Sequence, residues 1–122
     1  LNMKIGLGSD VAGGHTESMF RAITDTIQVS KMYMRYVDEA ATPVTFAEAF
    51  YLATKGGGEF FGKVGSFEKE YEFDALVLDD SILAHPLSLN IKQRAERAIY
   101  LSLDLCGGIK EKYVQGQRLN FI

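Results

Sequence analysis

The sequence has few of the residues that form disulfides, zinc clusters or membrane spans. Its 122 residues include a single cysteine, Cys106, so no internal disulfide can form, and we expect a reducing, cytoplasmic setting. The two histidines show neither His-x-His nor His-x-x-x-His spacing, so the chain cannot complete a closed zinc site alone. No apolar run approaches the roughly 20 residues of a membrane span, and we expect no membrane partner.

An excess of positive charge is also missing. Thirteen lysines and arginines are interspersed with 16 acidic residues, which gives a formal net charge of -3. Without a basic face to meet phosphate backbones, we expect no nucleic-acid partner. A hydrophobic content of 47% indicates an ordinary globular composition, and the length is typical of one domain.

The glycine-rich stretch KIGLGSDVAGGHTESM, residues 4–19, surrounds one aspartate, Asp10. The pattern predicts a strand over residues 4–8 that runs into a loop. A dinucleotide loop is disfavoured because Val11 stands where the third glycine of G-x-G-x-x-G is needed, and a P-loop because no Gly-Lys-Ser/Thr follows. Composition alone favours a simple turn at Asp10. The alternative is a functional carboxylate, because barrels of parallel strands place catalytic residues and metal ligands just past the strand ends.

The two histidines are weaker candidates. His15 follows Asp10 in the same loop and could touch a ligand, although a solvent-facing side chain is the more common situation for a histidine ahead of a helix. His85 precedes Pro86, and we expect it to be a loop residue.

Apolar periodicity predicts three helices, over residues 16–36, 45–55 and 91–101. A β-branched run and a turn signal predict two further strand regions, a strand over residues 73–79 and a hairpin over residues 112–122. Thr16, Thr45 and Asn90 are the expected N-caps, and Thr45 forms a capping box with Glu48. The triple glycine at 56–58 is expected to end the second helix in the left-handed conformation. Several large side chains are interpreted as core filling: Met19, Met32, Met34, Phe60 and Phe61.

Three segments, GLGSDVAGGHTESMFRAITDTIQVSK, TFAEAFYLATKGGGEFFG and VGSFEKEYEFDALVLDD, resemble guanine deaminases, a branch of the amidohydrolase superfamily. The resemblance covers nearly the whole chain. It implies an α/β chain in which residues 1–64 supply the last strand and outer helices of a (β/α)8 barrel. Residues 65–122 would supply strands of a small β-sandwich with an intervening helix, so the fold is expected to be incomplete on its own.

The function implied by the resemblance is zinc-dependent hydrolysis of guanine to xanthine and ammonia by the full-length enzyme. Asp10 would be the catalytic, substrate-binding and metal-binding residue, with the other zinc ligands supplied by earlier sequence. The implied partners are the remainder of the same enzyme and a small purine substrate, and we expect a homodimer. Two alternatives stay open: a sibling amidohydrolase acting on another aminopurine, pyrimidine or triazine, and a non-catalytic interaction module.

Two features depart from the family pattern. Glu70 stands where such enzymes usually have a glycine in a turn, and the stretch YLSLDLCGGIKEKYV lacks the Gly-Asp-Asp-Arg-Asn-like segment expected before the final hairpin.

Overall fold

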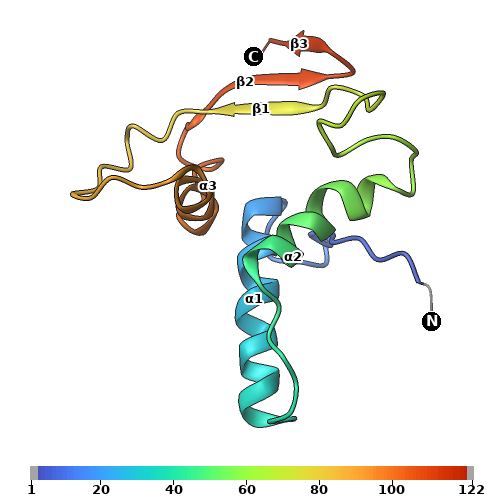
Figure 1. Ribbon diagram of the computed structural model, residues 1–122, viewed down its shortest axis with the longest axis vertical. Helices are drawn as coiled ribbons and strands as arrows, with labels where there is room; N and C mark the ends of the chain where they lie inside the picture. The colour runs from blue at the N-terminus through green and yellow to red at the C-terminus, as the bar shows by residue number, and fades with distance from the viewer. Residues whose placement is uncertain (1–2, 121–122) are drawn as a thin grey trace.

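The computed structural model describes residues 3–120 and shows helices on one side and a small sheet on the other (Figure 1). The elements, in chain order, are α1 (Met19–Tyr36), α2 (Phe46–Tyr51), the π-helical segment η1 (Leu52–Gly56), β1 (Ala75–Leu78), α3 (Ile91–Tyr100), β2 (Ile109–Val114) and β3 (Gln117–Leu119). All three predicted helical regions are therefore confirmed. No helix among the described residues is both long and apolar enough to span a membrane.

The helices pack around a small apolar core. Helix α1 contacts both α2 and α3, and Ile23 and Ile27 on its inner face are almost fully buried. They pack with Ala49 of α2 and Ile99 of α3. Within α2, Ala49 is buried, whereas Phe50 is exposed.

The sheet is antiparallel throughout, in the order β1-β2-β3. The predicted hairpin is confirmed, and its tight turn is made by Gln115 and Gly116, whose φ angles are 50° and 75°. Such left-handed pairs are typical of turns that match the twist of the two strands. Strand β1 is shorter than the predicted 73–79, and residues 121–122 of the predicted hairpin lie outside the described residues.

Two of the three predicted N-caps are confirmed and the third is wrong. Thr45 with Glu48, and Asn90 with Gln93, form complete capping boxes. The backbone and hydroxyl of Thr45 hold the pKa of Glu48 below its ordinary value. The first helix, however, starts at Met19 with Ser18 as its N-cap, and the predicted cap Thr16 instead accepts a hydrogen bond from the Ser18 N–H.

The triple glycine does not end the second helix as predicted. Gly57 has φ of -67°, a right-handed helical value, and helical geometry continues through Gly58. Two of these glycines instead allow close approach of other chain segments, because a Cβ on Gly58 would overlap the Val64 carbonyl and one on Gly56 would lie 3.1 Å from the Ile5 carbonyl oxygen. Left-handed glycines first occur at Gly62 and Gly65.

The predicted strand over residues 4–8 is not formed. No other strand lies alongside it within residues 3–120, and a strand exists only through hydrogen bonds to a neighbour. The segment is held in another way, by a 2.9 Å hydrogen bond from the Leu7 N–H to the Leu52 carbonyl of η1.

Most large apolar side chains of the described chain are exposed. Met32, Phe60 and Phe61, predicted to fill the core, are exposed, with Phe61 at 86%. Only six hydrophobic residues within residues 3–120 are buried: Ile23, Ile27, Ala49, Ala98, Ile99 and Leu103. Because so few apolar side chains are buried, much apolar surface of the described chain is left for further protein to cover.

Candidate active site

Asp10 lies at the bend of a tight loop between the Leu7 segment and α1. Its backbone is left-handed, with φ of 51°, and Ala12 two residues later has φ of 78°. Aspartate tolerates this region because its short polar side chain can bond locally, whereas alanine adopts it at a cost. Strained backbone of this kind is found preferentially at functional sites.

Two glycines close the loop over the aspartate. The N–H groups of Gly13 and Gly14 both donate to the Asp10 carbonyl oxygen. A Cβ on Gly13 would lie 2.7 Å from Asp10 Oδ2, and one on Gly14 would overlap the Ser9 carbonyl. The crowding of glycines around the aspartate is therefore explained by the loop, which folds back until its backbone touches the Asp10 carboxylate.

The Asp10 carboxylate is exposed and available. Within residues 3–120 no hydrogen bond or ion pair engages either carboxylate oxygen, although the loop fixes the backbone that bears it. A fixed carboxylate with open lone pairs can bind a cation or accept a proton.

The segments on both sides of the loop are anchored. Before it, Leu7 is tied to η1; after it, the buried hydroxyl of Ser18 accepts from the Arg21 N–H at 3.1 Å and donates to Asp104 at 2.5 Å. Sequence reasoning missed Ser18 and Asp104, because the two are 86 residues apart in the chain.

His15 does not approach the Asp10 carboxylate as a second ligand. Its Nε2 lies 3.3 Å from Asp25 Oδ2 of α1, and Arg21 Nε lies 3.2 Å from the other oxygen of the same carboxylate. The side chain of His15 is 68% exposed, so it faces solvent as the sequence favoured. When protonated, it forms an ion pair with Asp25 of α1.

A hollow of about 510 Å³ adjoins the loop. Gly8, Ser9 and His15 line this hollow together with residues of α1, among them Val29 and Tyr33. Because this hollow lies next to the residues that precede Asp10, it offers space for a ligand beside the loop.

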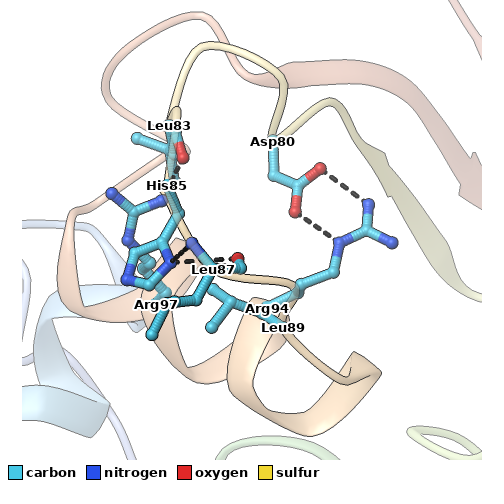
Figure 2. A pocket seen from close by; sticks show the side chains of 7 residues that line it. All are labelled: Asp80, Leu83, His85, Leu87, Leu89, Arg94 and Arg97. Atoms are coloured by element: carbon cyan, nitrogen blue, oxygen red, sulfur yellow. Dashed lines mark hydrogen bonds and ion pairs between the residues drawn. The ribbon is translucent and has the colours of Figure 1, made fainter.

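A second, smaller hollow of about 150 Å³ lies under the loop before α3 (Figure 2). Its charged side chains all have hydrogen-bond partners. Arg94 makes two 2.7 Å hydrogen bonds to Asp80, and Arg97 donates to the backbone carbonyls of Leu83 and Ala84. The pairing lowers the pKa of Asp80 and raises that of Arg94. These contacts close the loop on the helix, so we assign them a structural role.

The loop is closed further by His85, which lines the small hollow as Figure 2 shows. Its Nδ1 accepts a 3.1 Å hydrogen bond from the Leu87 N–H, two residues along the chain. The structure thus places His85 in a loop, as expected.

The residues present fit one ligand position of a zinc site. Asp10 offers carboxylate oxygens, which zinc accepts, and they are free of other partners among the described residues. A catalytic zinc takes about three protein ligands, and residues 3–120 contain no group of three or more potential metal ligands close together. Asp10 can therefore be one ligand of a site that other sequence completes.

Comparison with known proteins identifies the family. The family model described as the amidohydrolase family matches residues 2–115. The chain belongs to the amidohydrolase family. The match covers the Asp10 loop, all three helices and β1.

The relatives found in this family are guanine deaminases, as the three segments predicted. The guanine deaminase of Dictyostelium discoideum is 33% identical over 127 residues, covering 98% of this chain and 28% of that protein. Human guanine deaminase is 35% identical over 129 residues, covering 96% of this chain and 28% of the human protein. The chain thus spans just over a quarter of the length of these relatives.

Two solved structures share the arrangement of elements. A crystal structure of guanine deaminase from C. acetobutylicum, with guanine bound in its active site, matches 94% of this chain and 27% of its own, with a TM-score of 0.86 and 46% identity. The E. coli guanine deaminase matches with a TM-score of 0.76 and 24% identity, over 98% of this chain and 28% of its own, and supports the fold alone.

Proposed function

We propose that the chain is the C-terminal segment of a zinc-dependent guanine deaminase, and that the full-length enzyme hydrolyses guanine to xanthine and ammonia. The similarity to guanine deaminases over nearly the whole chain supports this function. The observation on the chain itself that favours it most is the Asp10 loop, which presents a carboxylate without a partner in residues 3–120 on a strained, glycine-closed backbone.

Asp10 would contribute both charge and proton transfer. Zinc, when bound, would supply Lewis-acid activation of the attacking water. The ionised Asp10 carboxylate accepts a proton from that water as its oxygen adds to the carbon bearing the amino group. The proton then passes to the departing nitrogen, the carbon–nitrogen bond breaks, and ammonia leaves. An asparagine would keep the shape of the side chain but could not take up the proton.

We also propose that residues 4–8 form the last strand of a (β/α)8 barrel once the neighbouring strands are present. Catalytic groups in such barrels lie just beyond the C-terminal strand ends, where Asp10 stands relative to this segment. The segment is mostly exposed and pairs with no strand within residues 3–120, which leaves its edges open for such neighbours.

The 122-residue chain alone is expected neither to deaminate guanine nor to hold zinc tightly. Its described residues bury a small core and offer a single well-placed ligand. The partner we propose is therefore the remainder of the enzyme, with a purine as substrate. The division at residues 64 and 65, a homodimer and a cytoplasmic location stay predictions.

The decisive experiment is a substrate panel for the full-length enzyme. Ammonia release is measured from guanine, adenine, cytosine and melamine, and xanthine is identified as the product from guanine. We expect guanine to be by far the best substrate. A clear preference for another of these compounds would assign the chain to a sibling enzyme, and no release from any substrate by the zinc-loaded enzyme would favour a non-catalytic module.

The same assay on the 122-residue chain alone, with zinc added, serves as the internal control. We expect no sustained xanthine formation. Turnover by this chain as a monomer would show that the missing ligands are not needed.

A further inference from the structure

A carboxylate far along the chain contacts the start of α1. Asp104 Oδ2 accepts a 2.5 Å hydrogen bond from the hydroxyl of Ser18, which is 5% exposed. The same hydroxyl accepts from the Arg21 N–H and thereby caps the helix. Since the first turn of α1 has no acidic residue of its own, Asp104 supplies the negative charge that a helix N-terminus favours.

Asp104 is held in place by a tight turn after α3. The N–H groups of Leu103 and Gly108 bond to the carbonyls of Ala98 and Leu103, and the Leu103 side chain is fully buried. A Cβ on Gly108 would overlap the Leu103 side chain. The turn therefore has little freedom, and the position of Asp104 follows from it.

The other oxygen of this carboxylate is unusual. Asp104 Oδ1 is buried and has no hydrogen-bond partner among residues 3–120. A buried unpaired oxygen costs stability, so its presence needs an explanation other than stability alone.

The contact bears directly on the Asp10 loop. Seven residues lie between Asp10 and Ser18, and the loop that they form is already folded tightly on itself. With Leu7 fixed at one end, the Ser18–Asp104 hydrogen bond fixes the other.

We propose that Asp104 is a positioning residue, which acts through Ser18 to hold the loop that places the Asp10 carboxylate for reaction. The catalytic part of this inference rests on the proposed function. Displacing a reacting group by about 1 Å can lower a rate by about 10²-fold, so loss of the anchor is expected to lower turnover without unfolding the enzyme.

The test uses the full-length enzyme with Asp104→Ala, Ser18→Ala and the double variant. Each single variant is expected to lower kcat by about 10- to 10²-fold, and the double variant to be little worse than either, because both remove one linkage. Asp104→Asn, which keeps an oxygen to accept from Ser18, should retain most of the activity. Asp80→Ala is the matched control, since it removes a carboxylate from an ion pair in the same half of the chain.

Cobalt substitution separates positioning from stability. The visible absorption of the Co²⁺ enzyme reports the geometry of its ligands, and it should change in Asp104→Ala and stay unchanged in Asp80→Ala. If Asp104→Ala lowers only the thermal midpoint, with kcat and the cobalt spectrum unchanged well below that midpoint, the proposal is overturned.

If the wild-type enzyme forms no xanthine, the proposed function is rejected, but the positioning role of Asp104 can still be tested by hydrogen exchange. The amides of Gly13, Gly14 and Arg21 should then exchange faster in Asp104→Ala, and that of Arg21 about fivefold faster or more in Ser18→Ala, which removes the helix cap itself. Unchanged exchange at these amides would overturn the positioning role independently of any activity.

Discussion

Gly13→Ala tests whether the position of the Asp10 carboxylate matters for turnover. The added Cβ would lie 2.7 Å from Asp10 Oδ2 and 3.2 Å from its Cγ, where ordinary contact begins near 3.4 Å. The carboxylate must therefore move by about 0.7 Å, the difference between 3.4 Å and 2.7 Å. Because Gly13 is outside the left-handed region and the atoms displaced belong to an exposed side chain, we expect a change in stability of no more than about 1 kcal/mol.

The expected result in the full-length enzyme is a kcat lowered by about 10- to 10²-fold, since a shift of this size disturbs the alignment of a reacting group. Steady-state xanthine formation is measured together with the thermal midpoint. Lys92→Ala is the control, because Lys92 is an exposed residue of α3 outside the Asp10 loop. Equal kcat values for the Gly13→Ala and wild-type enzymes, or equal losses in both variants, would refute the reasoning.

Three further predictions concern stability. Glu70→Gly should stabilise the fold against urea by about 0.5 to 1 kcal/mol, because Glu70 has a φ of 71°, which strains any residue except glycine. This gain should exceed the loss of the exposed ion pair with Lys63, and destabilisation would show that the backbone carries no strain. Ile23→Ala should cost about 2 to 5 kcal/mol and Val29→Ala little, since Ile23 is 2% and Val29 62% exposed; similar costs would contradict the assigned core face. The Arg94 guanidinium lowers the pKa of Asp80 from 3.8, so the stability from this pair is complete above that value and is lost as pH falls through the lowered folded-state pKa. Asp80→Asn should remove this part of the acid dependence, and unfolding curves unchanged at every pH would contradict it.

Local signals in the sequence predicted what local contacts determine. Thr45 and Asn90 start helices as expected, because each cap is completed by a side chain three residues away. Glu70 stands where the resemblance predicts a glycine, and its positive φ is a conformation that suits glycine. The Gln115-Gly116 turn likewise follows from its own residues.

Long-range contacts decided the features that the sequence left open. Thr16 and Ser18 are both competent caps, and Ser18 takes the role while bonded to Asp104. Gly58 stays helical, and its lack of a Cβ serves the close approach of the Val64 backbone, which no local pattern reveals. The strand expected over residues 4–8 needs neighbouring strands that residues 3–120 do not provide. For the candidate site, the sequence proposed Asp10 but missed the contacts by which Gly13 and Ser18 hold its loop.

The turnover of Asp10→Asn in the full-length enzyme is the most direct test of the central claim. We expect this variant to fold, with a thermal midpoint close to the wild-type value. Its xanthine formation should be slower by about 10² to 10⁴-fold, because asparagine cannot accept the proton of the attacking water. Near-normal turnover by this variant would contradict the role assigned to Asp10.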